Sequence, residues 1–252
     1  MPIKKFITFA ANGTNYIDAA NRLITQANSL NFFNQTYLYT IDDLIADKQF
    51  WQTHSEFILK NNRGFGYWIW KPYIIKKTLE TLSDGDILLY LDAGCEIDIN
   101  EKQYLFELIQ KIDVNNKLII GTYGCGFVNN WCKMDLILKL DAEQQYLNTP
   151  QHQAGANLYI INHITREFIN EWYEICCDYH MIDDSLSKND TFLNNELDSF
   201  IEHRHDQSVF SLLSKKYNIF NTGLDEKCIK YIRNRTGISK LNILEIEQVY
   251  LN

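Results

Sequence analysis

An unbroken apolar run, Ile87–Leu91, leads directly into Asp92 and constrains the fold more than any other segment. Five consecutive apolar residues predict a strand that is buried on both faces, as at the parallel centre of an α/β sheet. Asp92 would then lie at the carboxyl edge of this strand, close to the small residue Gly94. Ligands of open α/β sheets bind at this edge. A plain strand and turn would give the same pattern, so the neighbouring segments must decide.

The composition predicts one globular domain over residues 1–252, because 46% of the chain is hydrophobic and no Pro-, Gly- or Ser-rich linker interrupts it. A net charge of −8 argues against a nucleic-acid partner. The six cysteines form no Cys-x-x-Cys pair, which favours free thiols in a reducing compartment. No apolar segment reaches the length of a membrane span or of a signal peptide core. We therefore expect a cytoplasmic protein.

The N-terminus predicts a strand, a loop, a helix and a second strand, over Ile3–Ala10, Tyr16–Leu30 and Phe33–Thr40 for the three regular elements. This order is the first half of a nucleotide-binding unit. Neither a Gly-x-Gly-x-x-Gly motif nor a P-loop is present, so a dinucleotide site and an NTPase are not supported. Thr8 and Ala10, near the carboxyl end of the first strand, are candidate donor-binding residues.

The segment 61–72 combines glycines, large aromatic residues and two cations. Pro72 suits the first turn of a helix predicted over Tyr73–Leu82, so Lys71 would stand at a helix N-terminus. Such an end attracts anions through its free N–H groups and its dipole. Arg63 and Lys71 are therefore candidate diphosphate contacts. The aromatic residues can either seal the core or line the site.

A second cluster of polar residues, His203–Ser208, precedes a helix predicted over Val209–Lys216. A helix cap would explain Asp206 or Ser208. It would not explain the imidazole and guanidinium groups beside them. Such a group can supply a metal ligand, a cation for phosphate and a carboxylate near a reacting carbon. The catalytic candidates are His205, Asp206 and Gln207.

A basic run near the C-terminus leaves two interpretations open. It can be a solvated helix face, which is the usual role of such a run. It can also be a tail that closes over a phosphate group. Its members are Lys227, Lys230, Arg233 and Arg235.

Taken in order, Arg63–Pro72, Gly85–Gly94 and His203–Ser208 resemble the nucleotide-sugar glycosyltransferases of the GT-A fold. More narrowly, they resemble small bacterial and viral polysaccharide-type enzymes with a Tyr-Trp-x-Trp-Lys-Pro box and a His-Asp-Gln-Ser box. The resemblance implies an α/β fold of GT-A type, with a Rossmann-like, mixed, mostly parallel sheet flanked by helices. It places the nucleotide on about residues 1–125 and the acceptor on about residues 126–252.

The resemblance also implies a divalent cation, Mn²⁺ or Mg²⁺, held by an Asp-x-Asp motif after a central strand. Asp92 matches the first acid, but Gly94 stands where the second would be. Glu96 could point the same way along an extended segment, and His205 could complete the site. A water-rich ion held by phosphates and one carboxylate is the alternative. Gln207 replaces the glutamate of some retaining relatives, and a neutral amide cannot act as a carboxylate nucleophile.

The expected function is transfer of a hexose from a nucleotide diphosphate sugar to a hydroxyl of a glycan or glycolipid, in the cytoplasm or at the inner face of a membrane. The rival is an inactive domain of the same fold that binds glycans or nucleotide sugars. A phosphatase with Asp92 as nucleophile lacks the second Asp and the Thr of such enzymes. The expected donor-binding set is Thr8, Ala10, Arg63, Lys71, Asp92 and Gly94, and the expected sugar pocket is Trp131, Gln153 and Gly155.

Overall fold

The computed structural model describes residues 2–11, 13–110, 117–189 and 196–241. The strands in this part of the chain are β1 (Lys4–Ala10), β2 (Gln35–Thr40), β3 (Ile87–Leu91), β4 (Glu96–Ile97), β5 (Ile119–Phe127), β6 (Pro150–Ile160), β7 (Phe220–Thr222) and β8 (Ile229–Lys230). The α-helices are α1 (Thr14–Ser29), α2 (Ile41–Ala46), α3 (Lys48–Lys60), α4 (Gly64–Tyr67), α5 (Trp70–Leu79), α6 (Lys102–Gln110), α7 (Val128–Trp131), α8 (Met134–Lys139), α9 (Gln144–Leu147), α10 (His163–Cys177) and α11 (His205–Lys216). Two short 3₁₀ turns are η1 (Ile99–Glu101) and η2 (Tyr179–Met181).

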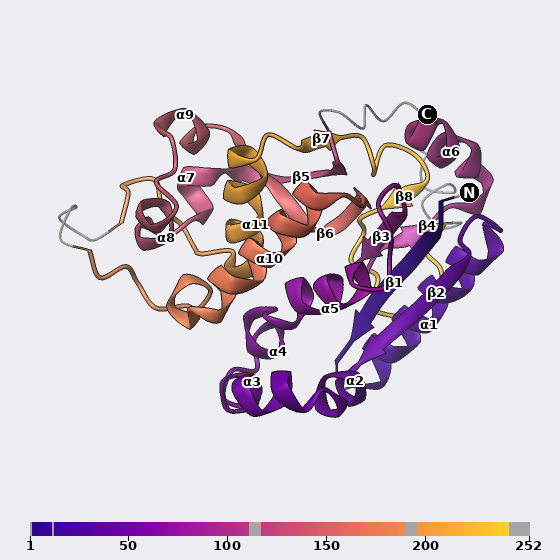
Figure 1. The fold of residues 1–252 in the computed structure, drawn as a ribbon, viewed down its shortest axis with the longest axis horizontal. Coiled ribbons are helices and arrows are strands. Elements are labelled where there is room, and N and C mark those ends of the chain that lie inside the picture. Colours follow the sequence, from indigo (N-terminus) through magenta and orange to yellow (C-terminus); the bar gives the residue numbers. More distant parts are fainter. Residues whose placement is uncertain (1, 12, 111–116, 190–195, 242–252) are drawn as a thin grey trace.

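Six of the described strands form one sheet in the order β2-β1-β3-β6-β5-β7. β1 pairs in parallel with β2 and β3, and β5 pairs in parallel with β7. β6 runs antiparallel to both β3 and β5, so it alone in this sheet opposes the common direction. The predicted mixed, mostly parallel sheet is therefore confirmed (Figure 1). A separate two-stranded sheet joins β4 to β8.

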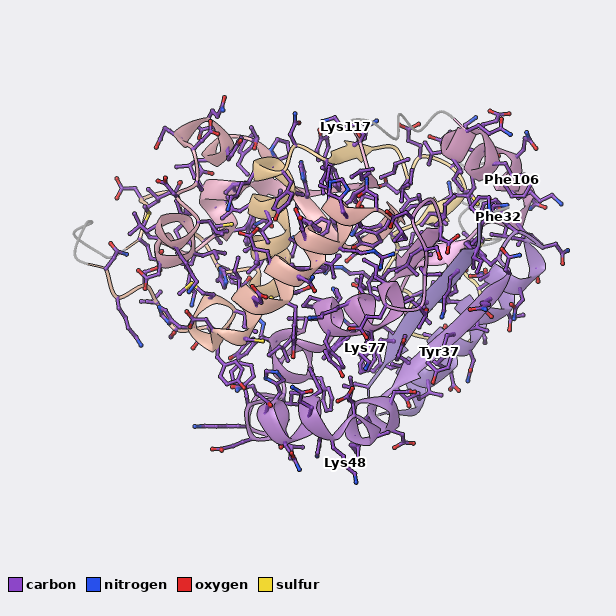
Figure 2. All side chains as sticks on the ribbon, viewed as in Figure 1. Phe32, Tyr37, Lys48, Lys77, Phe106 and Lys117 are labelled. Atoms are coloured by element: carbon purple, nitrogen blue, oxygen red, sulfur yellow. The ribbon has the colours of Figure 1, made fainter. Side chains whose placement is uncertain are left out.

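β3 lies at the centre of the main sheet, and all five of its residues are buried. The prediction from its unbroken apolar run is thus confirmed. α1 packs against β1 and β2, α11 packs against β6, and α10 lies against both α5 and α11 (Figure 1). Figure 2 shows how densely the side chains fill the space between these layers. The sheet continues through both predicted halves of the chain.

Two helices begin earlier than their sequences predict. α11 starts at His205 rather than at Val209, so the His-Asp-Gln-Ser box forms its first turn instead of preceding it. α5 starts at Trp70, which places Lys71 and Pro72 inside its first turn. Within the described residues, no helix combines the length and apolar character needed to cross a bilayer.

Candidate active site

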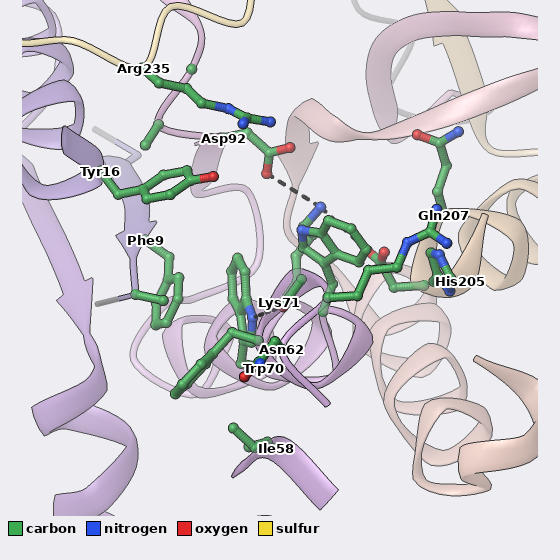
Figure 3. Close-up of a pocket in the computed structure, with 18 of the residues that line it drawn as sticks. Phe9, Tyr16, Ile58, Asn62, Trp70, Lys71, Asp92, His205, Gln207 and Arg235 are labelled. Carbon is green, nitrogen blue, oxygen red and sulfur yellow. Dashed lines mark hydrogen bonds and ion pairs between the residues drawn. The ribbon is translucent and has the colours of Figure 1, made fainter. Parts of the chain in front are cut away.

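A pocket of about 700 Å³ opens at the carboxyl ends of β1 and β3 and reaches the start of α11. Tyr16 and Arg235 lie on one side of it and His205 and Gln207 on the other, with Asp92 between them (Figure 3). Five cationic side chains and two carboxylates line it, within a chain whose net charge is −8. Such a local excess of positive charge favours anionic ligands. The cations are Arg63, Lys71, Arg204, Arg233 and Arg235, and the carboxylates are Asp92 and Asp206.

A sharply turned segment formed by α4 and the residues that join it to α5 carries Lys71 into the pocket. Phe65, Tyr67 and Trp68 all have positive φ, at 54°, 50° and 61°. Left-handed backbone is costly for such bulky residues, and proteins concentrate strain of this kind at functional sites. The turn is held by Trp70, whose Nε1 donates to the carbonyl of Gly64 at 2.9 Å. These aromatic residues therefore fix the backbone that directs the Lys71 side chain into the pocket.

The Lys71 ammonium lies between the two pocket carboxylates. Its Nζ is 3.3 Å from Oδ1 of Asp92 and 3.3 Å from Oδ2 of Asp206, and the residue is 3% exposed. Burial by itself lowers the pKa of Lys71, but attraction to Asp206 and Asp92 outweighs it, so the net pKa is raised. The amine thus stays charged although it is buried.

Asp92 is fixed by its own strand and by its neighbour β6. The Tyr90 hydroxyl donates to Oδ1 of Asp92 at 2.6 Å, and the Asp92 backbone N–H donates to the Gly155 carbonyl at 2.7 Å. A Cβ on Gly155 would lie 2.5 Å from Oδ2 of Asp92 and 2.9 Å from the hydroxyl of Tyr231. The absence of a side chain at Gly155 therefore leaves room for the Asp92 carboxylate. Gly155 does not line the pocket, so its assignment to the sugar pocket is corrected.

We predict that Gly155→Ala lowers the free energy of unfolding by about 1–3 kcal/mol, since the new methyl group overpacks the contact with Asp92. Denaturant unfolding would measure the loss. Gly124→Ala is the matched control, because a Cβ there meets its nearest atoms at 3.4 Å. Equal stability of the two variants would contradict the prediction.

Asp206 is buried in the first turn of α11, as its second residue, and the N-cap position is taken by Arg204. Burial raises the pKa of its carboxyl to about 7, with Lys71 opposing the shift and Asp92 adding to it. Its backbone carbonyl accepts from Nε1 of Trp172 at 2.9 Å, which anchors the turn. A carboxylate with a pKa near neutrality suits proton transfer. The helix-cap alternative is wrong for Asp206.

His205 and Gln207 flank Asp206 on the pocket wall. His205 Nδ1 lies 2.7 Å from the Ile182 carbonyl, so this nitrogen carries the proton and donates it. Burial lowers the pKa of His205 to about 4, which keeps the imidazole neutral. Gln207 Nε2 donates to Oε1 of Gln151 at 2.8 Å. Both residues thus present neutral polar groups to the pocket.

Glu96 does not join Asp92, so its predicted role as a metal ligand is wrong. The carboxylate is buried and accepts from Asn234 Nδ2 at 2.6 Å, from the Lys240 backbone N–H at 2.9 Å and from Gln26 Nε2 at 3.1 Å. Arg22 lies 3.7 Å away as its ion-pair partner. Glu96 therefore fastens the C-terminal strap, which we define as residues 231–240, to the body of the protein.

The strap explains the small residue that follows Asp92. The Asn234 backbone N–H donates to the Gly94 carbonyl at 2.8 Å, and a Cβ on Gly94 would lie 3.2 Å from Cα of Arg233. A larger residue at position 94 would push the strap away. Gly94 does line the pocket, as do Arg233 and Arg235 from the strap itself. The basic run is therefore not only a solvated surface, because its two arginines lie at the pocket.

Four other predicted site residues do not line this pocket. Thr8 donates through its hydroxyl to the Leu91 carbonyl at 2.8 Å, and Ala10 belongs to a buried cluster of alanines. The Trp131 ring carries the Arg204 guanidinium 4.1 Å from its centroid. Gln153 accepts from Asn157 Nδ2 through its carbonyl at 2.8 Å. Arg63 does reach the pocket, but it is ion-paired to Asp184 at 2.9 Å and to Glu202.

Sequence analysis missed the aromatic side of the pocket. Phe9, near the end of β1, and Tyr16, in the first turn of α1, line the pocket, and Phe9 stacks on Trp70 with centroids 3.8 Å apart. Tyr16 is 41% exposed, and the Arg235 guanidinium lies 5.6 Å from its ring centroid. The only available signal was their position on either side of the carboxyl end of a strand, at the edge where ligands bind.

The residues present do not fit the expected divalent cation. Lys71 already occupies the space between Asp92 and Asp206, and a metal ion there would meet a positive charge. Among the described residues, no group of three or more His, Cys, Asp or Glu side chains is arranged to hold a metal. His205, the other predicted ligand, stacks on Tyr67 and Trp68.

Fold and pocket together define a mixed α/β protein with a cation-rich cleft at the carboxyl edge of its sheet. No protein-family model and no curated protein sequence matches the chain. Several solved structures are similar to it. A glycosyltransferase involved in glycosylation of the major capsid of PBCV-1 is 10% identical, with 89% of this chain and 82% of that chain covered and a TM-score of 0.47.

Mouse xyloside xylosyltransferase 1, in its apo form, is 8% identical, with 88% of this chain and 85% of that chain covered and a TM-score of 0.44. The galactosyltransferase LgtC, in complex with donor and acceptor sugar analogues, is 11% identical, with 87% of this chain and 73% of that chain covered and a TM-score of 0.48. The chain thus spans most of the length of each of these proteins.

Proposed function

We propose that the protein is a glycosyltransferase that moves a hexose from a nucleotide diphosphate sugar to a hydroxyl of a glycan or glycolipid. The observation that carries this proposal is the Asp92–Lys71–Asp206 cluster at the base of a pocket lined by additional cations. Cations are needed to stabilise the leaving diphosphate, and a proton acceptor is needed for the hydroxyl that attacks the sugar. The cluster offers both within one site.

Donor binding is assigned to the side of the pocket formed by α1 and the strap. Arg233 and Arg235 form no ion pair with any described carboxylate, so their charges are available to phosphate oxygens. Charge-assisted bonds to phosphate are among the stronger hydrogen bonds. The exposed Tyr16 ring beside Arg235 offers a flat face for the nucleotide base.

The chemical step is a substitution at the anomeric carbon. The bond from this carbon to the diphosphate oxygen breaks, and its electron pair stays on that oxygen, where Lys71 stabilises the charge. The acceptor hydroxyl oxygen bonds to the anomeric carbon, and its proton passes to the Asp206 carboxylate. A pKa of about 7 leaves a substantial share of Asp206 ionised and ready to accept a proton at neutral pH.

The acceptor is assigned to the α11 side of the pocket. A Cβ on Gly124 would lie 3.4 Å from Nε2 of Gln207, so β5 passes directly beside this pocket residue. The same strand exposes Tyr123 and Phe127, at 54% and 48%. Aromatic rings of this kind pack against the apolar faces of sugars. Neither ring lines the pocket itself, so they support a glycan or glycolipid acceptor that extends beyond the pocket along β5.

A panel of nucleotide sugars tests the proposal. We expect one donor class among UDP-, GDP-, dTDP- and ADP-hexoses to raise the melting temperature by roughly 5–10 °C at a hundred times its Kd, since binding then adds about 2.7 kcal/mol. Release of the nucleoside diphosphate in the presence of glycan acceptors is the second readout. Stabilisation without release would favour the inactive binding domain, and the absence of any stabilisation would overturn both.

A further inference from the structure

The position of Lys71 carries an inference about how this pocket handles charge. A leaving diphosphate builds up negative charge, which must be met by cations held in place before the reaction. Gly94 supplies no carboxylate for a metal ion, and Glu96 is turned toward the strap. The cationic side chains that line the pocket can supply this positive charge.

Lys71 is held as a metal ion would be held. Two carboxylates lie 3.3 Å from its Nζ, from different elements of the fold. The Tyr90 and Trp70 rings add contacts, with centroids 5.8 and 5.9 Å from the same atom. Cations are attracted to aromatic faces at such distances. These contacts restrict the Lys71 side chain to few rotamers.

The helix that carries Lys71 reinforces this arrangement. The lysine is the second residue of α5, so the positive end of the helix dipole adds to its charge toward an anionic ligand, while the two carboxylates offset the repulsion between dipole and ammonium. Its backbone N–H donates to the Trp68 carbonyl at 2.9 Å, within the strained turn. The strain described above is thus used to fix one ammonium group at the pocket floor.

Charge bookkeeping shows why a second cation is unfavourable there. Asp92, Lys71 and ionised Asp206 sum to −1, from two negative charges and one positive charge. Arg233 and Arg235 add two positive charges nearby, so the set sums to +1. This net charge of +1 offsets half of the two negative charges on the diphosphate of a nucleotide sugar. A divalent ion would have to displace Lys71 from both carboxylates.

We propose that the Lys71 ammonium takes the place of the divalent cation, so that the protein binds a nucleoside diphosphate and transfers sugar without metal. This rests on the proposed glycosyltransferase function and deepens it. In the transfer step the ammonium remains protonated, and it hydrogen-bonds to the phosphate oxygen that receives the electron pair. Asp92 and Asp206 hold Lys71 in place, and Asp206 takes the acceptor proton.

Calorimetric titration of the full chain with UDP, GDP, dTDP and ADP tests the proposal, in EDTA and again in excess Mn²⁺. We expect the diphosphate that binds to have the same Kd in both buffers, within about threefold. Binding that needs Mn²⁺, or that tightens tenfold or more with it, overturns the inference but leaves the proposed function standing. No binding in either buffer would overturn the proposed function instead.

Variants of one helix supply the second measurement. In EDTA, Lys71→Ala should raise the Kd of the diphosphate at least about tenfold, as expected for loss of a charge-assisted contact. Lys77→Ala is the matched control, because Lys77 belongs to the same helix, pairs with Asp47 at 3.2 Å and does not line the pocket. An unchanged Kd for Lys71→Ala would overturn the inference. If this variant does not fold, the titrations of the wild-type protein in EDTA and in Mn²⁺ still test the inference.

Discussion

Asp206→Asn is expected to lower turnover at least about a hundredfold while leaving the fold intact. The amide keeps the volume of the carboxyl but cannot accept the proton of the acceptor hydroxyl. In wild type the base form is required, so turnover should rise with pH through about 7, the pKa to which burial raises Asp206. In the variant this rise should disappear. Steady-state kinetics over a pH series would measure both effects.

The pH dependence of stability should distinguish this variant from wild type. Because the folded-state pKa of Asp206 is raised, its contribution to stability is present below the ordinary aspartate pKa and is lost as pH rises through about 7. Above that pH the variant should therefore melt no earlier than wild type. Asp178→Asn, at an exposed ion pair with Lys139, is the control for a change of charge. Normal turnover in Asp206→Asn would remove this residue from the mechanism.

The buried strand and its terminal acid could be predicted because they depend on local pattern. Ile87–Leu91 is apolar at every position, and only a strand covered on both faces accommodates this at a sheet centre. The position of Lys71 at a helix N-terminus could be predicted in the same way, because the proline that follows it marks the first turn of a helix. Both residues lie where the pattern placed them, at the ligand edge of the sheet.

Glu96 could not be placed in the same way. The prediction assumed an extended segment after Asp92, whereas the chain turns at Ala93 and Gly94 and sends Glu96 into β4. Its partner Asn234 lies 138 residues away in the sequence. The hydrophobic periodicity of a sequence carries no information about a contact between residues so far apart in the chain. The strap, and with it the role of Gly94, became visible only in three dimensions.

The start of α11 shows a further limit of sequence patterns. The apolar pattern begins at Val209, so the sequence predicts the helix from there. The structure begins it at His205, whose φ of 55° is left-handed. Polar residues fill this first turn because it faces the pocket rather than the core. Functional sites are where local patterns are expected to fail.

The strap arginines give the largest expected effect on donor affinity. Arg233→Ala/Arg235→Ala should raise the Kd of the bound nucleoside diphosphate at least about a hundredfold, because two charge-assisted phosphate contacts of about 1.5–3 kcal/mol each are lost. The strap itself should stay in place, since Glu96 and Asn234 fasten it independently of these side chains. Calorimetric titration with the diphosphate and with the parent nucleoside would separate phosphate contacts from base contacts.

The same basic run supplies the matched control for these arginines. Lys227 lies over the Tyr104 ring, 5.5 Å from its centroid, and Lys230 pairs with Glu96 through the backbone in the β4–β8 sheet. Neither lysine lines the pocket. Lys227→Ala/Lys230→Ala removes the same net charge, so it reproduces any general change in the field of the protein. A hundredfold loss in the arginine variant beside a small change in the lysine variant would establish direct phosphate contact. Equal losses in the two variants would instead reduce the strap to long-range attraction, and the donor phosphates would then have to be assigned to Lys71 alone.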